Sequence, residues 1–481
     1  MDPKKNSDEA AMALHRIQRR DFVTSGALLA GAGVFGPDAF AHKPGDIEMG
    51  KIELRDWAGY FANTKYFGNG EKTAGVYLPS TNDQVSRLVK IALETGKKVR
   101  AVGLQSGMEA SWYGGPGSMM VSTQKLVRKE GPVFTTARGP AGQVATVTVG
   151  AGVRMDDLLK AAWEKGYSID SAPAPGWMSV GGCIATASHG SGMGSLSSIM
   201  LSCTYVNGKG DVRTVSAGDP ELEALRQSIG LIGIITEVTI KLVKAFNLRM
   251  IGGRILTSEW AKYLPEGSFS FVQVQPLSLV PTKPGETWSR YFFTERTDKE
   301  GLGTYDQNYK KMEGVFYTGY VDFAVEGPAF EVAMNFQPPN LPISGAEYCV
   351  PMDRFQGALD EMMAEENIRK FPPVYWLKKV GREPGHLSNS DGPSVWCGLY
   401  NIVSGENHGD NLNSRNEVLL AAAEKIMVKA GGRPHIGKMM RSPEILRNFS
   451  EKGMAKFLEI REAEDPDRLF LSEYLQKIFS L

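Results

Sequence analysis

The sequence predicts an α+β protein in which antiparallel strands are mixed with helices, and three observations support this class. Apolar side chains recur at helical spacing over 83–95, whereas residues 144–149 show the alternation of a strand. Two strand-like runs are joined at Asn207-Gly208, a pair that favours a tight hairpin turn. Beyond Phe246 the loops lengthen and aromatic residues and proline pairs become more frequent. We therefore expect two successive domains rather than a strict alternation of strand, helix and strand.

The composition is that of a globular protein with no excess of either charge. Of the 481 residues, 42% are hydrophobic, and 54 basic residues balance 54 acidic ones. Zero net charge disfavours a nucleic-acid partner and a membrane surface. The cysteines Cys183, Cys203, Cys349 and Cys397 lie far apart and form no C-x-x-C pair. We expect free thiols, without a disulfide framework or a metal site.

The N-terminal segment has the pattern of an export signal. Arg19-Arg20 is followed by a weakly apolar stretch over 23–35 and by the A-x-A cleavage pattern Ala39-Phe40-Ala41. The segment resembles a twin-arginine signal, with a membrane anchor as the alternative. We therefore exclude residues 1–41 from the fold and expect the mature protein in the periplasm or secreted. The apolar stretch is too short to cross a bilayer, so no integral membrane span is predicted.

Residues 52–245 form the first predicted domain. A helix from Asp83 is expected to end at Gly96, and a short strand follows over 99–102. The other expected elements are a strand over 144–150, a helix over 154–165 ended by Gly166, a hairpin within 199–216, a helix over 221–230 and a strand over 233–243.

The second predicted domain, residues 246–440, is expected to hold substrate on an antiparallel sheet flanked by helices. Its clearest elements are strands over 345–351, 373–381 and 394–403 and a helix over 352–366. Aromatic residues of these strands are expected in the core, or else in an apolar pocket; they are Tyr375, Trp376, Trp396 and Tyr400. The last segment, 441–481, is expected to return to the first domain.

Three stretches of small residues suggest a close approach between the backbone and a ligand. They read VGLQSG over 102–107, VGAG over 149–152 and SVGGCIATASHGSGMGSLSS over 179–198, and each is expected directly after a strand. Glycine permits positive φ and lets backbone N–H groups face an anion, so a diphosphate is the expected guest. P-loop and Rossmann fingerprints are absent from these places, which disfavours both nucleotide-binding folds.

These stretches resemble a known superfamily. The run 144–198 resembles the flavin-binding core of the vanillyl-alcohol oxidase superfamily, whose FAD-binding domain is called PCMH-type. The GGRPHIGK run over 431–438 and the DPDRLFLSEYL tail resemble its aldonolactone and alditol oxidase branch. The APAPG run over 172–176 is similar to flavin-linked cholesterol oxidases of the same superfamily. The resemblance extends from about residue 52 to the C-terminus.

The resemblance implies FAD as the cofactor, bound by a PCMH-type domain of two subdomains. Small neighbours for the flat ring are expected at Gly181, Gly182, Ala185 and Ala187. His189 is either a flavin neighbour or a structural histidine that fixes its loop. The resemblance assigns the following residues to FAD: Val102, Gly103, Leu104, Gln105, Ser106, Gly107, Gly150, Pro175, Ser179, Val180, Gly181, Gly182, Ala185, Thr186, Ser188, His189, Gly190, Ile235 and Lys438.

One departure from the superfamily concerns the attachment of FAD. Many relatives carry VGSGHS in the first loop, and its histidine bonds covalently to the flavin. Here Ser106 stands at the corresponding position, so no imidazole is present there. The resemblance therefore implies that FAD is held non-covalently.

The resemblance draws the catalytic residues from the second domain. Glu347 matches the glutamate of a Glu-x-Arg pattern, and Cys349 stands where arginine is usual. Lys438 would lie near flavin N1 and stabilise the reduced ring. Glu347 and His435 would hydrogen-bond the substrate hydroxyl and take its proton. A thiol cannot replace a guanidinium group, which weakens the case for a polyol or a sugar lactone.

The predicted function is the oxidation of a CH–OH group of a small alcohol or lactone by hydride transfer to FAD. Two alternatives stay open: oxidation of a larger hydrophobic alcohol such as a sterol, and FAD binding without catalysis. Either dioxygen or another electron acceptor is compatible with a loop built of Ala185, Ala187 and glycine.

Overall fold

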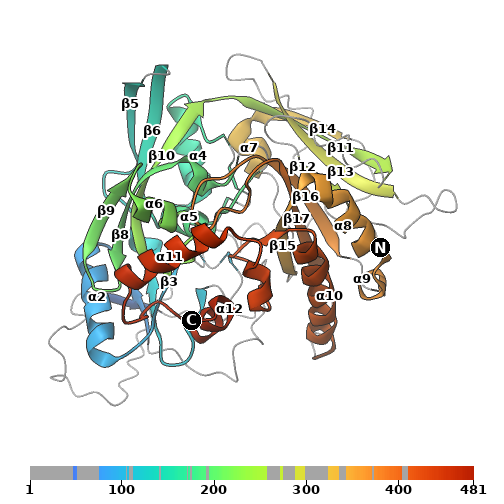
Figure 1. Ribbon diagram of the computed structural model, residues 1–481. Coiled ribbons are helices and arrows are strands. Elements are labelled where there is room, and N and C mark those ends of the chain that lie inside the picture. The colour runs from blue at the N-terminus through green and yellow to red at the C-terminus, as the bar shows by residue number, and fades with distance from the viewer. Residues whose placement is uncertain are drawn as a thin grey trace, which may run out of the picture. The chain divides into compact units, whose positions relative to one another are not determined.

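We describe the fold from a computed structural model of the chain (Figure 1). The described residues are 47–50, 75–104, 106–107, 112–139, 142–170, 172–173, 176–190, 194–256, 271–274, 288–297, 323–334, 343–370, 373–402 and 410–481. All of them belong to the unit formed by residues 42–481. The predicted export signal, residues 1–41, lies outside the described residues.

The first sheet contains four strands in the order β1-β2-β4-β3. The strands are β1 (Glu48–Gly50), β2 (Gly75–Leu78), β4 (Met119–Ser122) and β3 (Val99–Val102). Strand β4 pairs in parallel with both β2 and β3, so this sheet departs from the antiparallel pattern that we expected. A parallel pair needs a crossover, and helix α2 (Asn82–Thr95) provides it between β2 and β3.

Helix α2 begins and ends as the sequence predicts. The Thr81 hydroxyl accepts a hydrogen bond from the backbone N–H of Gln84, and Gly96 ends the helix with φ of +62°. Its apolar side chains, Leu88 among them, pack into a core with Met119 of β4. The short 3₁₀ helix η1 (Thr123–Lys125) then leads out of β4.

The second sheet is antiparallel and has the order β5-β6-β10-β8-β9, with β7 paired to β10 (Figure 1). Its strands are β5 (Val133–Gly139), β6 (Gly142–Gly150), β10 (Gly233–Lys244), β8 (Met200–Asn207), β9 (Val212–Ser216) and β7 (Tyr167–Ser168). The predicted hairpin at Asn207-Gly208 is present between β8 and β9. Helices α4 (Met155–Glu164) and α6 (Pro220–Leu225) confirm the other predicted elements.

Two sequence predictions in this region are corrected. The helix expected over 221–230 ends at Leu225, because Ile229 and Gly230 adopt positive φ of 47° and 74°. The backbone N–H of Ile229 then donates to the carbonyl of Ala185 at 2.8 Å. The stretch 179–198 does not follow a strand directly, and it is not only a loop. It contains helix α5 (Val180–Ala185) and the 3₁₀ helix η2 (Leu196–Ile199).

Strands after residue 246 belong to two further sheets. The three-stranded sheet has the order β13-β11-β14, formed by β13 (Trp288–Thr297), β11 (Asn247–Leu256) and β14 (Phe323–Pro328), and helix α7 (Ala329–Met334) follows β14. The five-stranded sheet has the order β12-β16-β17-β15-β18. It consists of β12 (Phe271–Val274), β16 (Val374–Val380), β17 (Ser394–Ile402), β15 (Ile343–Pro351) and β18 (Arg433–Pro434).

Alternation gives the five-stranded sheet two different faces. One face carries Glu347, Trp376, Lys378, Trp396 and Tyr400, since successive side chains of a strand point to opposite sides. The opposite face carries buried side chains that share a core with helix α8; they are Tyr348, Leu377, Cys397 and Leu399. The helices of this region are α8 (Met352–Ala364), α9 (Glu366–Lys370) and α10 (Asp410–Lys429) (Figure 1).

The C-terminal segment contains η4 (Pro443–Leu446), α11 (Glu451–Glu464) and α12 (Glu473–Phe479). Between the last two helices, Leu469 and Phe470 pack in the same core as helix α2. The backbone N–H of Val99 donates to the carbonyl of Leu469 at 2.9 Å. Among the described helices, none combines the length and the apolar character that a membrane crossing requires.

Candidate active site

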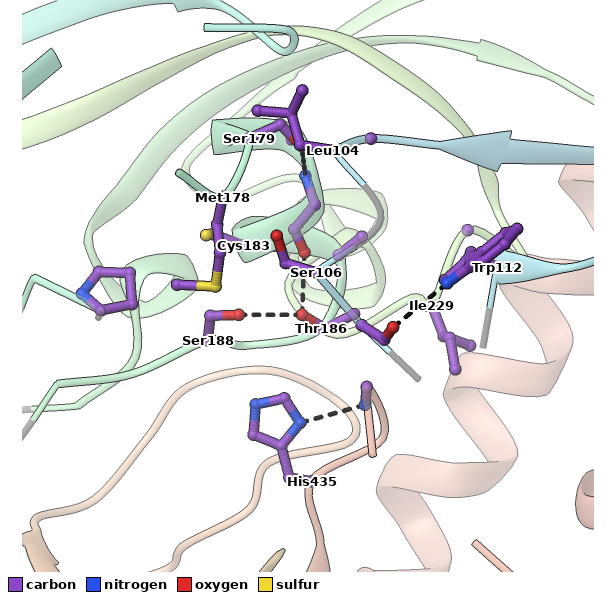
Figure 2. A pocket seen from close by; sticks show the side chains of 18 of the residues that line it. Leu104, Ser106, Trp112, Met178, Ser179, Cys183, Thr186, Ser188, Ile229 and His435 are labelled. Carbon is purple, nitrogen blue, oxygen red and sulfur yellow. Dashed lines mark hydrogen bonds between the residues drawn. The ribbon is translucent and has the colours of Figure 1, made fainter. Parts of the chain in front are cut away.

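A cavity lies between the small-residue segments of the N-terminal half and the face of the five-stranded sheet that carries Glu347 and Lys378. Figure 2 shows side chains that line it. It encloses about 1210 Å³ of space, part of it open to solvent. We call the lining residues from 100–235 the glycine wall and those from 347–438 the sheet wall.

The glycine wall is built by close approach of three backbone segments. A Cβ atom at Gly103 would overlap the hydroxyl of Ser179, and a Cβ at Gly152 would overlap the carbonyl oxygen of Thr123. A Cβ at Gly181 would lie 2.7 Å from the Cβ of Ala151. Real side-chain atoms do not approach so closely, so glycine is required for the segments to meet.

Helix α5 supplies the centre of the glycine wall, and its short polar side chains are ordered by local hydrogen bonds. The hydroxyl of Ser179 accepts from the backbone N–H of Gly182 at 3.4 Å. The hydroxyl of Thr186 donates to the carbonyl of Gly182 at 2.9 Å and lies 3.1 Å from the hydroxyl of Ser188 (Figure 2). These bonds keep the polar atoms at fixed positions along the cavity.

The structure brings most of the predicted cofactor residues to the cavity. Those that line it are Gly103, Leu104, Ser106, Gly107, Ser179, Gly181, Gly182, Ala185, Thr186, Ser188, His189, Ile235 and Lys438. Val102, Gly150, Val180 and Gly190 lie beside it without lining it. Gln105 and Pro175 lie outside the described residues.

At Ala187 and Gly150, the structure gives a different reason for a small residue than a neighbouring cofactor. Ala187 is fully buried away from the cavity and has φ of 51°, so its backbone conformation limits the side chain. A Cβ at Gly150 would overlap the carbonyl oxygen of Leu126, so strand packing explains that glycine. Neither position needs a flat ring nearby to account for its size.

The small side chains and the hydroxyl groups that line the cavity fit FAD. The Ser106 hydroxyl is buried, and within the described part of the chain it has no hydrogen-bond partner. An unpaired buried hydroxyl is costly unless a ligand completes it. Small side chains leave the backbone of α5 accessible to a flat ring, and Ser179, Thr186 and Ser188 add hydroxyl groups to the cavity lining. The residues present are therefore compatible with the group that the sequence implies.

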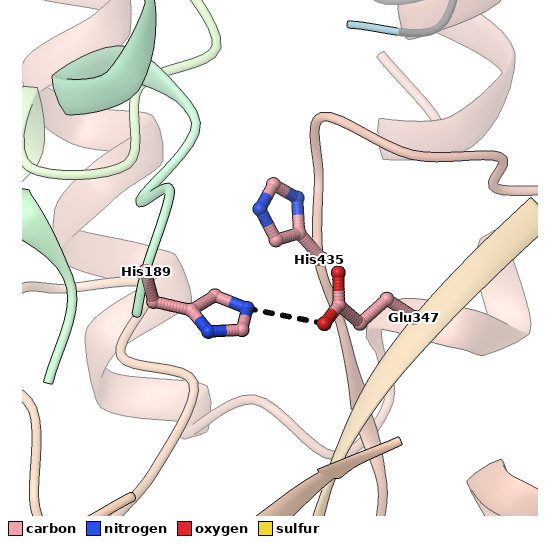
Figure 3. A group of neighbouring side chains, drawn as sticks. All are labelled: His189, Glu347 and His435. Carbon is pink, nitrogen blue, oxygen red and sulfur yellow. Dashed lines mark ion pairs between the residues drawn. The ribbon is translucent and has the colours of Figure 1, made fainter. Parts of the chain in front are cut away.

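All three predicted catalytic residues line the cavity from the sheet wall. His189 faces two of them, Glu347 and His435, from the glycine wall (Figure 3). The Nε2 atom of His189 lies 3.3 Å from Oε1 of Glu347, and both side chains are buried. The His189 ring stacks on Trp396, with centroids 4.2 Å apart and planes at 10°. The His435 ring lies 5.5 Å from that of His189. His189 therefore meets the catalytic group directly.

Tyr400 completes the surroundings of the carboxylate. Its hydroxyl donates to Oε2 of Glu347 at 3.1 Å, and Nζ of Lys438 lies 5.5 Å from the centre of its ring. A Cβ at Gly398 would lie 2.5 Å from the Tyr400 ring, and one at Gly345 would lie 2.6 Å from it. The two glycines thus make room for the phenol to lie across the sheet and reach Glu347.

Burial and neighbouring charges shift the titration of these groups. Burial lowers the pKa of His435 well below its ordinary value, and the Lys438 charge lowers it further. Burial also lowers the pKa of Lys438 to about 8, although Glu347 raises it. Burial alone would raise the pKa of Glu347, but the contact with His189 and the charge of Lys378 hold it well below its usual range. Burial lowers the pKa of His189 itself. At neutral pH, Glu347 is therefore a carboxylate and His435 a neutral imidazole.

Cys349 makes no contribution to the cavity lining. It is 1% exposed and packs with Val380 and Trp396. Burial raises the pKa of its thiol well above the ordinary value. The residue at this position is therefore a neutral part of the core.

His189, Glu347 and His435 also lie within the reach of a single metal ion, since one ligand atom from each lies within 4.8 Å of the others. The sequence predicted no metal site. Lys378 and Lys438 line the same cavity, and their charges oppose a bound cation.

Several lining residues were not assigned to the site from the sequence; they are Arg100, Ala101, Trp112, Thr123, Pro173, Met178, Cys183, Ile229, Gly230, Gly233, Trp376, Lys378, Tyr400 and Gly437. Gly230 ends a predicted helix and Gly233 begins a predicted strand, which was a usable signal. No local pattern in the sequence indicated that Lys378 faces the cavity. Of the aromatic residues that we singled out, Trp376 and Tyr400 line the cavity. Trp396 is buried and stacks on His189, whereas Tyr375 is buried on the opposite face of the sheet.

Comparison with known families confirms the resemblance drawn from the sequence. Residues 73–216 match the family described as FAD binding domain. Residues 340–478 match the family described as D-arabinono-1,4-lactone oxidase. FAD is therefore the cofactor of this chain, and the two matched segments contain most residues of the two cavity walls.

Individual relatives agree with these matches. D-arabinono-1,4-lactone oxidase of Saccharomyces cerevisiae is 35% identical over 202 residues, which are 41% of this chain and 35% of the relative. The match thus spans about a third of the length of the yeast protein. L-gulono-1,4-lactone dehydrogenase of Mycobacterium tuberculosis is 23% identical over 431 residues, 84% of this chain and 96% of the relative.

A solved structure shows the same fold. Cholesterol oxidase from Brevibacterium sterolicum superposes with a TM-score of 0.68 at 16% sequence identity. The superposition covers 93% of this chain and 99% of the other. The predicted α+β class with a PCMH-type FAD-binding fold is confirmed.

Proposed function

We propose that this protein is an FAD-dependent oxidoreductase that oxidises a CH–OH group of a small sugar lactone or polyol. The position of Glu347 carries the proposal. Its Oε1 atom is buried in the cavity and accepts no hydrogen bond from a described residue, since the 3.3 Å contact with His189 is not aligned as one. A buried carboxylate oxygen left without a donor is costly. A substrate hydroxyl group provides the missing donor.

FAD, when bound, supplies the acceptor for the hydride that leaves the substrate carbon. Glu347 takes the hydroxyl proton, because it is the ionised group of the cluster and is held with one oxygen free for the substrate. His189 lies beside that oxygen, with Nδ1 donating to the carbonyl of Gly190 at 3.0 Å and Nε2 facing Glu347. The proton that reaches Glu347 is therefore shared with His189, and the two groups titrate as a coupled pair.

His435 is better placed to donate a hydrogen bond than to take a proton. The backbone N–H of Gly437 donates to Nδ1 of His435 at 3.1 Å. The proton of the neutral ring is consequently on Nε2, which is free to donate to the substrate oxygen. Of the two proton acceptors expected from the sequence, Glu347 is thus the stronger candidate.

Lys438 provides positive charge next to the cofactor. It lines the cavity immediately after Gly437, whose Cα faces Thr186 of the glycine wall so closely that a Cβ would lie 2.9 Å from the Thr186 Cβ. At this junction of the two walls, a cation stabilises negative charge that develops on the reduced ring.

FAD is held without a covalent bond in this proposal. Ser106 occupies the position at which covalent relatives carry histidine, and its free hydroxyl supports a hydrogen bond in place of that link. Acid precipitation of the purified protein tests the attachment. We expect a yellow supernatant, and colour retained in the pellet would contradict non-covalent binding.

Anaerobic flavin bleaching tests the activity. The purified protein is mixed with D-arabinono-1,4-lactone, L-gulono-1,4-lactone, an alditol series and cholesterol, and the flavin absorbance is followed. We expect bleaching by a lactone or an alditol. Absence of bleaching by every compound would contradict the proposal and favour FAD binding without catalysis. Admission of air then separates dioxygen from another electron acceptor.

A sterol-like alcohol is the second candidate substrate. Trp112, Trp376 and Tyr400 line the cavity, and an apolar lining suits a larger hydrophobic molecule. The likeness in fold to cholesterol oxidase supports the same choice. Bleaching by cholesterol alone would make this the substrate class.

We also propose that the protein is exported by the twin-arginine route, with cleavage after Ala41, and that residues 246–440 form the substrate domain. The Arg19-Arg20 pair and the Ala39-Phe40-Ala41 pattern support export. Mass measurement of the protein recovered from the periplasm tests this. Replacement of both arginines by lysine is expected to retain the protein in the cytoplasm.

A further inference from the structure

The sheet wall contains a second lysine that the mechanism above does not use. Lys378 lies on β16 and lines the cavity together with Glu347 and Lys438. In the register of the sheet it is opposite Trp396, which is opposite Cys349. Lys378 therefore occupies the same row and the same face as Cys349, two strands away, or about 9.6 Å from it.

The side chain of Lys378 leans from this row toward the row of Glu347. Its Nζ atom lies 5.9 Å from the centre of the Trp376 ring, and Trp376 is opposite Gly398, which is opposite Glu347. The Tyr400 ring covers Gly398 in this row, and Glu347, Trp376 and Tyr400 line the cavity together with Lys378. The ammonium group is thus directed toward the space in front of the carboxylate.

The charge of Lys378 is not neutralised by an ion pair. No described carboxylate forms a salt bridge with it, and Glu347 acts on it only at longer range. Burial lowers the pKa of Lys378 while Glu347 raises it. A partly buried cation without a counter-charge is expensive unless a ligand brings negative charge.

We propose that Lys378 is a catalytic residue whose ammonium group contacts the oxygen of the reacting hydroxyl and stabilises negative charge on it. This inference depends on the proposed function. The O–H proton passes to Glu347, the C–H bond breaks with its hydrogen leaving as a hydride that FAD, when bound, would accept, and a C=O bond forms. Negative charge accumulates on the oxygen as the proton departs, and a fixed cation lowers the energy of that state.

The position of Lys378 also explains how the site functions with a thiol at 349. Cys349 is buried behind Trp396 and offers no charge. Lys378 supplies a cation from the same row of the sheet, so positive charge in front of Glu347 is retained although its origin has moved by two strands. An arginine at 349 is consequently not required for an alcohol substrate.

The test compares Lys378→Ala, Lys378→Arg and the control Lys379→Ala by anaerobic stopped-flow reduction of FAD with the lactone or alditol that the wild type oxidises. Lys379 is the next residue of β16 and does not line the cavity. We expect reduction to slow by about 10²-fold in Lys378→Ala, by less than tenfold in Lys378→Arg, and to be unchanged in Lys379→Ala. Added ethylammonium is expected to restore part of the rate of Lys378→Ala, which a purely structural role would not produce.

An equilibrium measurement complements the rates. In a Glu347→Gln background, where turnover is slow, binding of the same substrate is followed by the flavin absorbance. Adding Lys378→Ala is expected to weaken binding by about tenfold, or 1.4 kcal/mol.

Two results would overturn the role of Lys378. One is a Lys378→Ala variant that reduces FAD within twofold of the wild type. The other is a slow variant that neither Lys378→Arg nor ethylammonium improves, accompanied by a lower unfolding temperature, which would make the residue structural. Either result, with an active wild type, leaves the proposed function intact. A wild type that no alcohol reduces would instead remove the proposed function.

Discussion

The two walls of the cavity hold their residues in place by different means. In the glycine wall, backbone segments pack directly on one another, as Gly181 does on Ala151. In the sheet wall, strand pairing places large side chains opposite one another, so that Glu347, Tyr400 and Lys378 share one face. The glycine wall sets the shape of the cavity and contributes His189, whereas the sheet wall supplies Glu347 and the two lysines. Substitutions in the first should therefore affect stability and cofactor retention, and those in the second should affect chemistry while the fold persists.

The largest effect is expected from Glu347→Gln in the sheet wall. The amide has the same shape but cannot take a proton, so kcat should fall by about 10²–10⁴-fold. FAD content and the unfolding temperature should be retained. Stopped-flow reduction and flavin absorbance measure the two quantities. Glu366→Gln is the control, because that side chain is 77% exposed on helix α9. A rate within tenfold of the wild type would assign proton transfer to another group.

The next effect is a pH dependence that originates at Lys438. Burial lowers its pKa to about 8, so the side chain loses its charge as the pH rises through that value. If the charge supports FAD reduction, the rate should fall on the alkaline side with a midpoint of about 8. Lys438→Arg should move this limb upward by more than one pH unit, since arginine stays charged to a pKa of about 12.5 or higher. An alkaline limb at the same place in both proteins would exclude Lys438 as its origin.

Two glycine-to-alanine substitutions test whether the close backbone packing of the glycine wall stabilises the fold. Gly181→Ala places a Cβ 2.7 Å from that of Ala151 and should destabilise the fold by about 1–3 kcal/mol, with loss of FAD. Gly357→Ala is the control, because helix α8 leaves open space at that position. There the substitution should stabilise the fold by about 0.5–1 kcal/mol, because alanine favours a helix. Equal unfolding temperatures for the two variants would mean that the backbone around Gly181 shifts at little cost to accept the added Cβ.

The two walls also differ in how much of them the sequence reveals. Helix α2, the hairpin at Asn207-Gly208 and strand β10 follow from local spacing and turn chemistry, and they are confirmed. Helix α5 was read as a loop, because six residues rich in glycine have little helical propensity of their own. Its contact with Ala151 comes from elsewhere in the chain, which a local pattern cannot contain.

The sheet wall was predicted only where a family motif marked it. Glu347, His435 and Lys438 were named through the resemblance, and the structure places them in one cavity. Tyr400 and Lys378 were not named as site residues, because β16 and β17 have apolar residues on both faces. Period-two alternation then fails to show which side chains face the cavity. Their positions depend on the register between strands distant in the sequence, which only the folded structure fixes.

The smallest effect is expected from Tyr400→Phe, which removes one hydrogen bond and leaves the sheet wall otherwise unchanged. The phenol donates to Oε2 of Glu347 at 3.1 Å, and this bond favours the charged carboxylate. A hydrogen bond to a charged group contributes about 1.5–3 kcal/mol, so its loss should raise the pKa of Glu347 by about one unit or more. The acid limb of the reduction rate should move to higher pH by a similar amount, with less than a tenfold change at the optimum. Tyr375→Phe is the control, since that phenol belongs to the opposite face of the sheet. An unshifted acid limb in Tyr400→Phe, with the fold intact, would mean that His189 and Lys378 keep Glu347 ionised without help from the phenol.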